Sequence, residues 1–198
     1  MAIQTPLQTA PQDKVWTYDD YAALPDDGNR YEVIEGELVM APAPRVDHQR
    51  CSFNLGLIIG PHVKSHGLGE VLAAPCDVVL DERNVLQPDL IFISRDRLKI
   101  VTEKNLQGAP DLAVEILSPS SLRRDRIQKR RIYARHGVLH LWLLDAQAQT
   151  LEEFVLDGST YRLASACEGD EIFHPAIFPG LDIPLKEVWG QPLQEGAS

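Results

Sequence analysis

Three residues suited to holding a metal and acting on a phosphate dominate this sequence: Asp89, Glu115 and Lys129. Glu115 interrupts the otherwise apolar run 112–117, which predicts a buried strand. Desolvating an unpaired charge is expensive, so Glu115 needs a cation or a metal as its partner. Asp89 lies near the start of a second predicted strand, 86–93, and two carboxylates on neighbouring strands are hard oxygen ligands of the kind Mg²⁺ prefers. The pattern indicates a metal-dependent phosphodiesterase site.

Strand alternation and helix periodicity predict how these side chains meet. Along 112–117, Glu115 lies on one face with Ala113 and Leu117, and the other three residues lie on the opposite face. The next segment is predicted to be a helix that Ser120 or Ser121 caps and that ends near Gly137. Three residues recur at every fourth position and share one side of this helix: Asp125, Lys129 and Tyr133. Lys129 can therefore reach back over the sheet toward Glu115.

The remaining elements follow from the same signals. Helices are predicted at 17–24, at 46–66 with a kink or split at Pro61, and at 96–100; strands are predicted at 31–40, 70–80, 139–145, 151–156 and 161–165. On the long helix, Phe53 and Leu57, with Gly60 and Lys64, mark the apolar side. Asp157-Gly158 predicts a hairpin between the last two strands, and 173–189 should close over one edge.

Composition indicates one ordinary globular domain. The chain has 198 residues, of which 44% are hydrophobic and 24% charged, and no apolar run approaches the ~20 residues of a membrane helix. We expect a flexible arm over 1–15, a single domain over 16–190 and a flexible tail over 191–198. Its three cysteines form no zinc pattern and no CxxC pair, which favours reduced thiols in a cytoplasmic protein without a membrane partner.

Charge both opposes and permits a nucleic-acid partner. The net charge of −10 argues against casual binding of a polyanion. The predicted helix after Ser121 nevertheless carries a local basic run, and four of its members are candidates for contact with phosphates: Arg123, Arg124, Arg126 and Arg130. A solvated helix face explains such a run equally well.

Several motifs together resemble a known family. They are Arg30-Tyr31-Glu32-Val33-Ile34-Glu35-Gly36-Glu37-Leu38, His48, Gln87-Pro88-Asp89, Glu115-Ile116-Leu117-Ser118-Pro119-Ser120, then Asp125, Lys129, Tyr133, Gly137 and Trp142, and finally Phe178-Pro179-Gly180-Leu181. In these motifs the chain resembles the Uma-two family of restriction endonucleases, within the PD-(D/E)XK nuclease superfamily, over roughly 16–189. The resemblance implies an α/β restriction-endonuclease-like core, with a central mixed sheet flanked by helices, and our reading adds a C-terminal β-hairpin.

The resemblance also implies roles for individual residues. Asp89 matches the first acidic position of the superfamily motif and Glu115 the second, while the motif lysine falls on Leu117. The resemblance implies that this lysine has moved to the following helix as Lys129. The carbonyl of Ile116 is a further expected metal ligand.

Four further residues are expected in accessory roles. Glu32 best matches an extra carboxylate of the superfamily, although a strand-edge glutamate facing water is nearly as good an explanation. His48 matches a family position, and a structural histidine is the alternative. Asp125 could orient Lys129, and Tyr133 is either packing or accessory. Asp77 is expected to cap a loop rather than to bind metal.

These observations predict a DNA endonuclease that uses Mg²⁺, for which Mn²⁺ substitutes, and a homodimer is a plausible assembly. One alternative is an inactive nuclease-fold module that binds nucleic acid or a protein partner. Another is a structural metal or ion-pair site with no nucleic-acid partner, to which the negative charge gives some weight. Retention on DNA without metal, followed by cutting after metal is added, separates the three.

Overall fold

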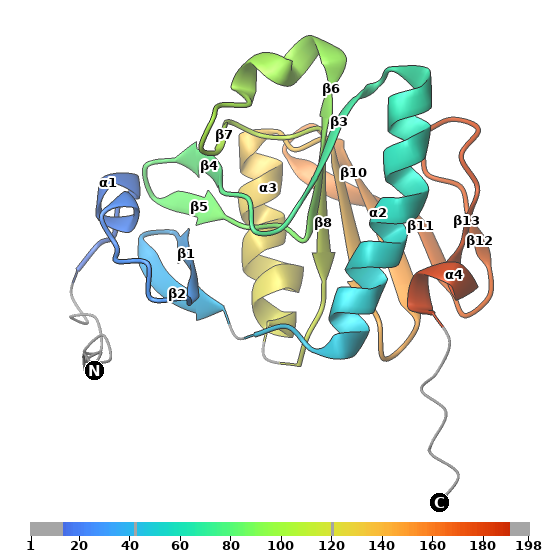
Figure 1. Ribbon diagram of the computed structural model, residues 1–198, viewed down its shortest axis with the longest axis horizontal. Helices are drawn as coiled ribbons and strands as arrows, with labels where there is room; N and C mark the ends of the chain where they lie inside the picture. Colours follow the sequence, from blue (N-terminus) through green and yellow to red (C-terminus); the bar gives the residue numbers. More distant parts are fainter. Residues whose placement is uncertain (1–13, 42, 120, 191–198) are drawn as a thin grey trace, which may run out of the picture.

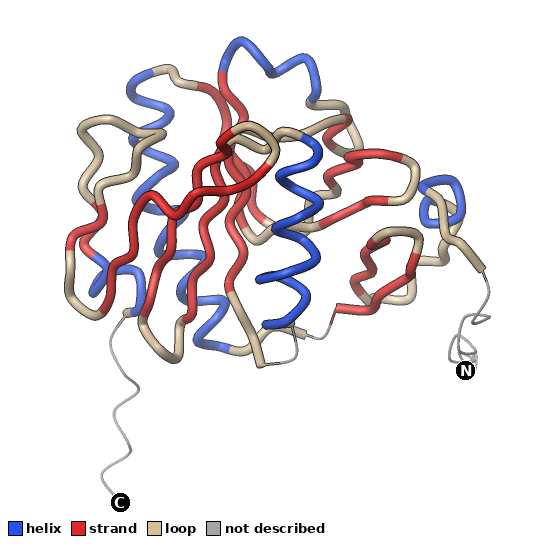
Figure 2. Tube along the Cα trace, turned by 180° about the vertical axis from the view of Figure 1, so that it is seen from behind, coloured by secondary structure: helices blue, strands red, loops and turns tan. Residues whose placement is uncertain are grey.

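A six-stranded mixed sheet forms the centre of the molecule. The computed structural model describes residues 14–41, 43–119 and 121–190. The strands lie in the order β11-β10-β9-β8-β6-β3, and only the β8–β9 pair is parallel. Their bounds are β3 Gly69–Ala73, β6 Leu90–Ser94, β8 Leu112–Ile116, β9 His140–Asp145, β10 Thr150–Asp157 and β11 Thr160–Glu168. Figure 2 shows these strands side by side. The predicted α/β class with a mixed sheet flanked by helices is confirmed.

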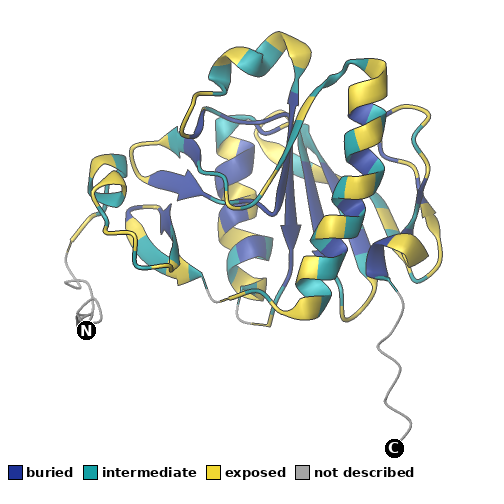
Figure 3. Ribbon diagram, viewed as in Figure 1, coloured by how far each residue is buried: buried dark blue, intermediate teal, exposed yellow. Residues whose placement is uncertain are grey.

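Helices cover both faces of this sheet, as Figure 1 shows for α2 (Val46–His66) and α3 (Arg130–His136). Alternation along β8 sends Leu112, Val114 and Ile116 into the core under α2, and Ala113 with Leu117 into the core under α3. Glu115 shares the α3 face, as predicted. Figure 3 shows the central strands buried and the outer sides of the helices exposed.

A second, five-stranded sheet lies beside α3 and carries part of the site. Its order is β2-β1-β5-β4-β7. The bounds are β1 Arg30–Ile34, β2 Glu37–Ala41, β4 Val78–Asp81, β5 Asn84–Leu86 and β7 Leu106–Gln107. Helix α1 (Tyr18–Ala22) packs on this sheet and begins at Thr17, whose side chain forms a capping box with Asp20. The predicted short helix at 17–24 is thus present.

Three segments that were each predicted to be one strand form two strands in the structure. The second sheet was not predicted, and it takes part or all of each segment. The strand at 31–40 is the hairpin β1–β2, whose two turn residues, Glu35 and Gly36, both have positive φ. The strand at 70–80 divides into β3 and β4 around Pro75, and that at 86–93 divides into β5 and β6 around Pro88. Proline has no N–H for ladder hydrogen bonds, so the chain leaves one sheet for the other at these two points.

Helix α2 runs unbroken through Pro61, so the predicted split at this residue was wrong. Pro61 is exposed, so water can satisfy the carbonyl that its missing N–H leaves open. The predicted apolar side was also wrong, because Phe53 and Leu57 are 66% and 57% exposed. The buried stripe recurs every fourth residue: Cys51, Leu55, Ile59 and Val63.

The C-terminal third completes the core. Asp157-Gly158 begins the tight turn between β10 and β11, as predicted. Strands β12 (Ile172–Phe173) and β13 (Ile183–Pro184) and helix α4 (Leu185–Trp189) follow. They pack over the α2 face of the main sheet, where Phe178 and Phe173 contact Trp142 edge-on, rather than over a sheet edge as predicted. Apolar burial therefore draws this segment onto the face.

The other predictions concern local features and the chain ends. The predicted helical piece at 96–100 is the 3₁₀ segment η1 (Arg95–Ile100). Cys51, Cys76 and Cys167 are free thiols. Among the described residues, no helix combines the length and apolarity needed to span a membrane. The predicted arm falls largely, and the predicted tail wholly, outside the described residues.

Candidate active site

Asp89 lies where the chain crosses from the small sheet to the large one. It immediately precedes β6, and its backbone N–H donates to the Val114 carbonyl at 2.9 Å. Its Oδ2 accepts a hydrogen bond from the Ile116 N–H at 2.7 Å and lies 3.3 Å from His48 Nε2, in the first turn of α2. The carboxylate is therefore fixed to the end of β8 on one side and to α2 on the other.

Glu115 and Lys129 meet across the α3 face of the sheet. Lys129 Nζ lies 3.0 Å and 3.1 Å from the two oxygens of Glu115, 2.8 Å from Glu32 Oε1 and 3.6 Å from Asp125 Oδ1. Tyr133 Oη donates to Glu115 Oε1 at 2.5 Å. The side chains of these residues are almost fully buried. One ammonium thus holds three carboxylates from a strand of each sheet and from its own helix.

The helix that presents Lys129 begins with π-helical turns, η2 (Arg124–Lys129), and continues as α3. Such turns recur at functional sites. Before this helix, Ser118 Oγ accepts from the Ser121 N–H at 3.2 Å and Ser121 Oγ accepts from the Ser118 N–H at 3.1 Å, whereas Arg123, the residue that precedes η2, makes no side-chain capping hydrogen bond. The predicted caps were Ser120, which lies outside the described residues, and Ser121. Gly137 ends the helix in the left-handed conformation, as predicted.

Electrostatics in the cluster favour one positive charge among crowded negative ones. Burial opposes the charge of Lys129, but Glu115, Glu32 and Asp125 outweigh it and raise the pKa of Lys129 well above its usual range. Burial raises the pKa of Glu115 and of Asp125, and the nearby carboxylates add to this against the opposing charge of Lys129. The cluster therefore has an excess of buried carboxylates over cations.

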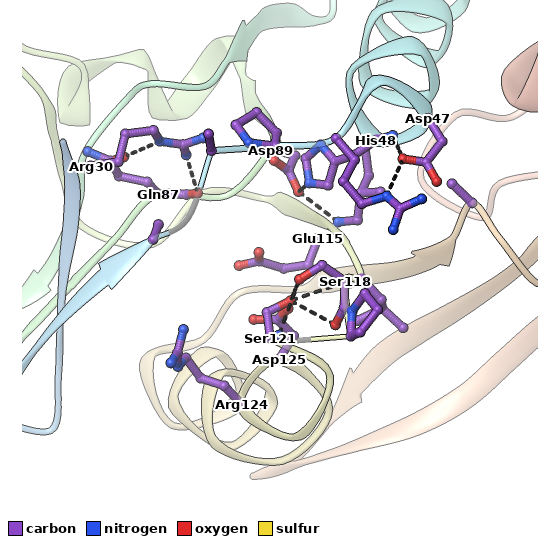
Figure 4. A pocket seen from close by; sticks show the side chains of 18 of the residues that line it. Arg30, Asp47, His48, Gln87, Asp89, Glu115, Ser118, Ser121, Arg124 and Asp125 are labelled. Atoms are coloured by element: carbon purple, nitrogen blue, oxygen red, sulfur yellow. Dashed lines mark hydrogen bonds and ion pairs between the residues drawn. The ribbon is translucent and has the colours of Figure 1, made fainter. Parts of the chain in front are cut away.

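A cavity of about 310 Å³ opens onto these groups. Both sheets, α2 and η2 contribute to its wall, and Asp89, Glu115 and Lys129 all line it. Figure 4 shows Asp89 and Glu115 from neighbouring strands, with Asp125 on the helix beneath them. The structure therefore brings the three predicted central residues to one pocket.

Comparison with known proteins places this site in a family. A family model described as "Putative restriction endonuclease", Uma2, matches residues 18–186. The chain belongs to the Uma2 family. The expected resemblance to the Uma-two family is thereby confirmed. No curated protein matches the chain.

A solved structure supports the fold assigned to this Uma2 chain. It is described as a putative nuclease belonging to DUF820 from Anabaena variabilis, and its chain is 20% identical to this one. The match has a TM-score of 0.73 and covers 87% of this chain and 97% of that chain. At this identity the likeness shows a shared fold.

All four expected accessory residues of the Uma2 site reach the cluster or its edge. Glu32 pairs with Lys129 and accepts from the Gln87 backbone N–H at 2.8 Å, so the strand-edge explanation does not hold. His48 contacts Asp89, which outweighs the effect of burial and raises the pKa of His48. Asp125 contacts Lys129 and Tyr133 contacts Glu115. Asp77 was expected to cap a loop, but its side chain instead accepts from the side chains of Tyr21 (Oη) and Gln87 (Nε2), outside the cavity wall.

The four expected phosphate-contacting arginines of the helix separate into different environments. Arg124 lines the cavity. Arg126 Nη1 lies 2.6 Å from Glu152 Oε2, and the Arg130 guanidinium stacks over the Phe154 ring at 5.1 Å. Arg123 is exposed and lies outside the cavity wall. Of the four, only Arg124 is therefore placed with the acidic residues.

Sequence reasoning gave no role to two residues of the Uma2 site. Arg30, at the start of β1, donates from Nε to Gln87 Oε1 at 3.0 Å, and both residues line the cavity. They lie in the quoted motifs, but they are 57 positions apart, one at the start of β1 and the other directly after β5. Their proximity depends on the second sheet, which the sequence analysis did not predict.

The donor set fits a hard divalent cation. Within the described chain, no three His, Cys, Asp or Glu side chains converge as a ready-made metal centre. Mg²⁺ needs fewer, because it commonly binds through one or two carboxylates, its waters and substrate phosphates. Asp89 and Glu115 supply that pair, and Asp89 Oδ1 makes no hydrogen bond to any described residue. The excess of buried carboxylates is the charge that a divalent cation would balance.

Proposed function

We propose that this Uma2 protein is a metal-dependent endonuclease that hydrolyses phosphodiester bonds in DNA. The observation that carries the proposal is the convergence of Asp89, Glu115 and Lys129 on one cavity. Family membership supports a nuclease-type hydrolase. The local basic wall at Arg124 supports an anionic substrate despite the net charge of −10.

Asp89 and Glu115, with the Ile116 carbonyl, would hold Mg²⁺ or Mn²⁺. Ile116 is adjacent in space to Asp89 through the 2.7 Å hydrogen bond and also lines the cavity. A cation bound there would lower the pKa of a coordinated water and offset negative charge on the phosphate.

The chain's own groups supply the remaining electrostatics. Lys129 is fixed by three carboxylates, so its ammonium needs little reorganisation to offset charge that develops on the phosphate or to orient a water. Glu32 and Asp125 position Lys129, and Tyr133 positions Glu115. His48 positions Asp89 from the opposite side.

Nicking of supercoiled plasmid with Mg²⁺ or Mn²⁺ tests the proposal. Wild type should cut, and Glu115→Ala and Lys129→Ala should both lose cutting. Cutting that survives in Lys129→Ala but not in Glu115→Ala would keep the metal site and remove Lys129 from the mechanism. No cutting by wild type of plasmid, single-stranded DNA or RNA would contradict the proposal and favour the binding module.

A further inference from the structure

We infer that Arg30, held in place by Gln87, binds a phosphate of the DNA backbone beside the carboxylates of Asp89 and Glu115 in the cavity. The inference concerns a binding residue, and it rests on the proposed function only for the identity of the ligand. Arg30 lines the same cavity as Asp89 and Glu115 but comes from the other sheet. It lies outside the basic helix from which the sequence led us to expect phosphate contacts.

Hydrogen bonds to Gln87 hold the Arg30 guanidinium in place. Its Nε donates to Gln87 Oε1 at 3.0 Å and its Nη2 approaches the Gln87 backbone carbonyl at 3.5 Å. The Gln87 amide is itself held, because its Nε2 donates to Asp77 Oδ1 at 2.7 Å and to Tyr21 Oη at 3.2 Å. Tyr21 Oη also donates to Asp77, at 2.7 Å. This chain of contacts anchors the guanidinium to the residue before β4, the residue after β5 and helix α1.

The acceptors that hold Arg30 are uncharged, which distinguishes it from most cations of the cavity. Lys129 is paired with carboxylates, His48 with Asp89, and Arg45 with Asp47. Within the described residues, Arg30 and Arg124 are the cavity-lining cations that have no ion pair. Their charges are therefore available to an anion, even though the whole chain is strongly negative.

The chemistry of these two groups specifies the ligand. A guanidinium presents a planar fork of N–H donors that matches two phosphate oxygens. Arg30 lies above Glu115 and Arg124 below it in Figure 4, on strand β1 and helix η2. Two guanidinium groups with Glu115 between them suit a chain of phosphodiesters. One phosphate can face the carboxylates while its neighbours along the chain bind Arg30 and Arg124. The ligand class is thus a nucleic-acid backbone rather than a single phosphate.

The experiment measures binding of a fluorescein-labelled single-stranded DNA by anisotropy in EDTA, across a series of salt concentrations. Arg30→Ala should weaken binding about tenfold and lower the salt slope by about 0.7, the value of one phosphate contact on a single strand. Arg30→Lys should keep the slope and lose several-fold in affinity, because the charge stays but the fork is lost. Arg162→Ala, an exposed arginine on β11, is the matched control and should change the affinity less than about twofold.

Gln87→Leu tests the positioning role. It removes no charge, yet it should shift affinity and salt slope toward those of Arg30→Ala, because the guanidinium is no longer directed. Thermal unfolding of each variant shows whether the fold is intact. If Arg30 and Gln87 only supported the strand, their variants would change the melting temperature and leave the salt slope of DNA binding unaltered. That result would overturn the inference.

Plasmid cutting by wild type, run in parallel, separates this inference from the proposed function. Cutting by wild type with an unchanged affinity and slope in Arg30→Ala overturns the inference and leaves the nuclease standing. The expected losses in Arg30→Ala and Gln87→Leu without any wild-type cutting support the inference and remove the nuclease. No measurable binding by wild type overturns the inference as well.

Discussion

Two buried glutamates of the central sheet have opposite surroundings. Glu115 on β8 and Glu153 on β10 lie on either side of β9 and are only 4% and 1% exposed. Glu115 points toward α3, where it contacts Tyr133, and Glu153 points toward the α2 face, where it accepts from Trp142. The same residue type, equally desolvated, occurs twice in one sheet.

Their partners differ in kind. Glu153 accepts hydrogen bonds from Trp142 Nε1 at 3.2 Å and from the Ala176 backbone N–H at 3.2 and 3.3 Å, and His140 Nδ1 lies 3.3 Å away. These contacts tie the C-terminal segment to the sheet. Glu115 has an ammonium and three nearby carboxylates, and it lines a cavity, whereas Glu153 does not. Burial of a carboxylate therefore does not mark a site; an excess of charge facing a cavity does.

Removing the cation from the charged cluster should have the largest effect on stability. Lys129→Ala leaves Glu32, Glu115 and Asp125 buried without their ammonium, so we expect the free energy of unfolding at about pH 7 to fall by about 3–5 kcal/mol. Urea denaturation measures this. Lys99→Ala, an exposed lysine of η1, should cost less than about 0.5 kcal/mol.

The pH dependence of that loss identifies its cause. Burial and mutual repulsion raise the pKa values of Glu115 and Asp125 in the folded protein, and removing Lys129 raises them further. The folded variant then binds more protons than the unfolded chain, so its stability rises as the pH falls. The deficit relative to wild type should shrink from about pH 7 to about pH 5. A deficit that stays constant would point to lost packing of the lysine stem instead.

The second-largest expected difference between Glu115 and Glu153 is in the affinity for a metal ion. Glu115→Gln replaces a proposed ligand, so we expect Mn²⁺ to bind about 10–100-fold more weakly in isothermal titration calorimetry. Glu153→Gln makes the same chemical change on the other face and should leave the affinity unaltered. Equal affinities in both variants would remove Glu115 from the metal site without any reference to cutting.

Stability should respond to the second glutamate by a smaller amount. Glu153→Gln keeps one carbonyl acceptor for Trp142 and the Ala176 N–H, but it buries an NH₂ group in place of an acceptor. We expect a loss of about 1–3 kcal/mol in urea denaturation and faster proteolysis within 173–189. Plasmid cutting should be unchanged, and reduced cutting by a folded variant would contradict the purely structural role of Glu153.

The sequence predicted Glu115 but missed Glu153 for a local reason. A charge inside an apolar run, as at Glu115, stands out, whereas 151–156 shows no such contrast. A β-bulge between Glu153 and Phe154 also lets both consecutive residues be buried, which a period of two cannot represent. Lys129 was found because its spacing from Asp125 and Tyr133 matched one helix side and because a family pattern supported it.

Contacts between the two sheets could not be predicted in the same way. The Glu32–Lys129 and Arg30–Gln87 contacts depend on where β1 and β5 lie, and the second sheet was not foreseen. Pro75 and Pro88 did carry a signal, because proline within an apolar run argues against a continuous strand. Glu35-Gly36 gave a weaker one, since glutamate seldom adopts the positive φ that the turn requires.

A pair of tyrosines gives the finest comparison between charged and uncharged partners on the α3 face. Tyr133 Oη donates to the Glu115 carboxylate at 2.5 Å, and Tyr161 Oη donates to the Val138 carbonyl at 2.7 Å. Hydrogen bonds to charged groups contribute about 1.5–3 kcal/mol and those between neutral groups about 0.5–1.5 kcal/mol. Tyr133→Phe should therefore destabilise the fold by about 1 kcal/mol more than Tyr161→Phe in urea denaturation. Equal losses would mean that Lys129 already satisfies Glu115, and that Tyr133 contributes chiefly through the packing of its ring.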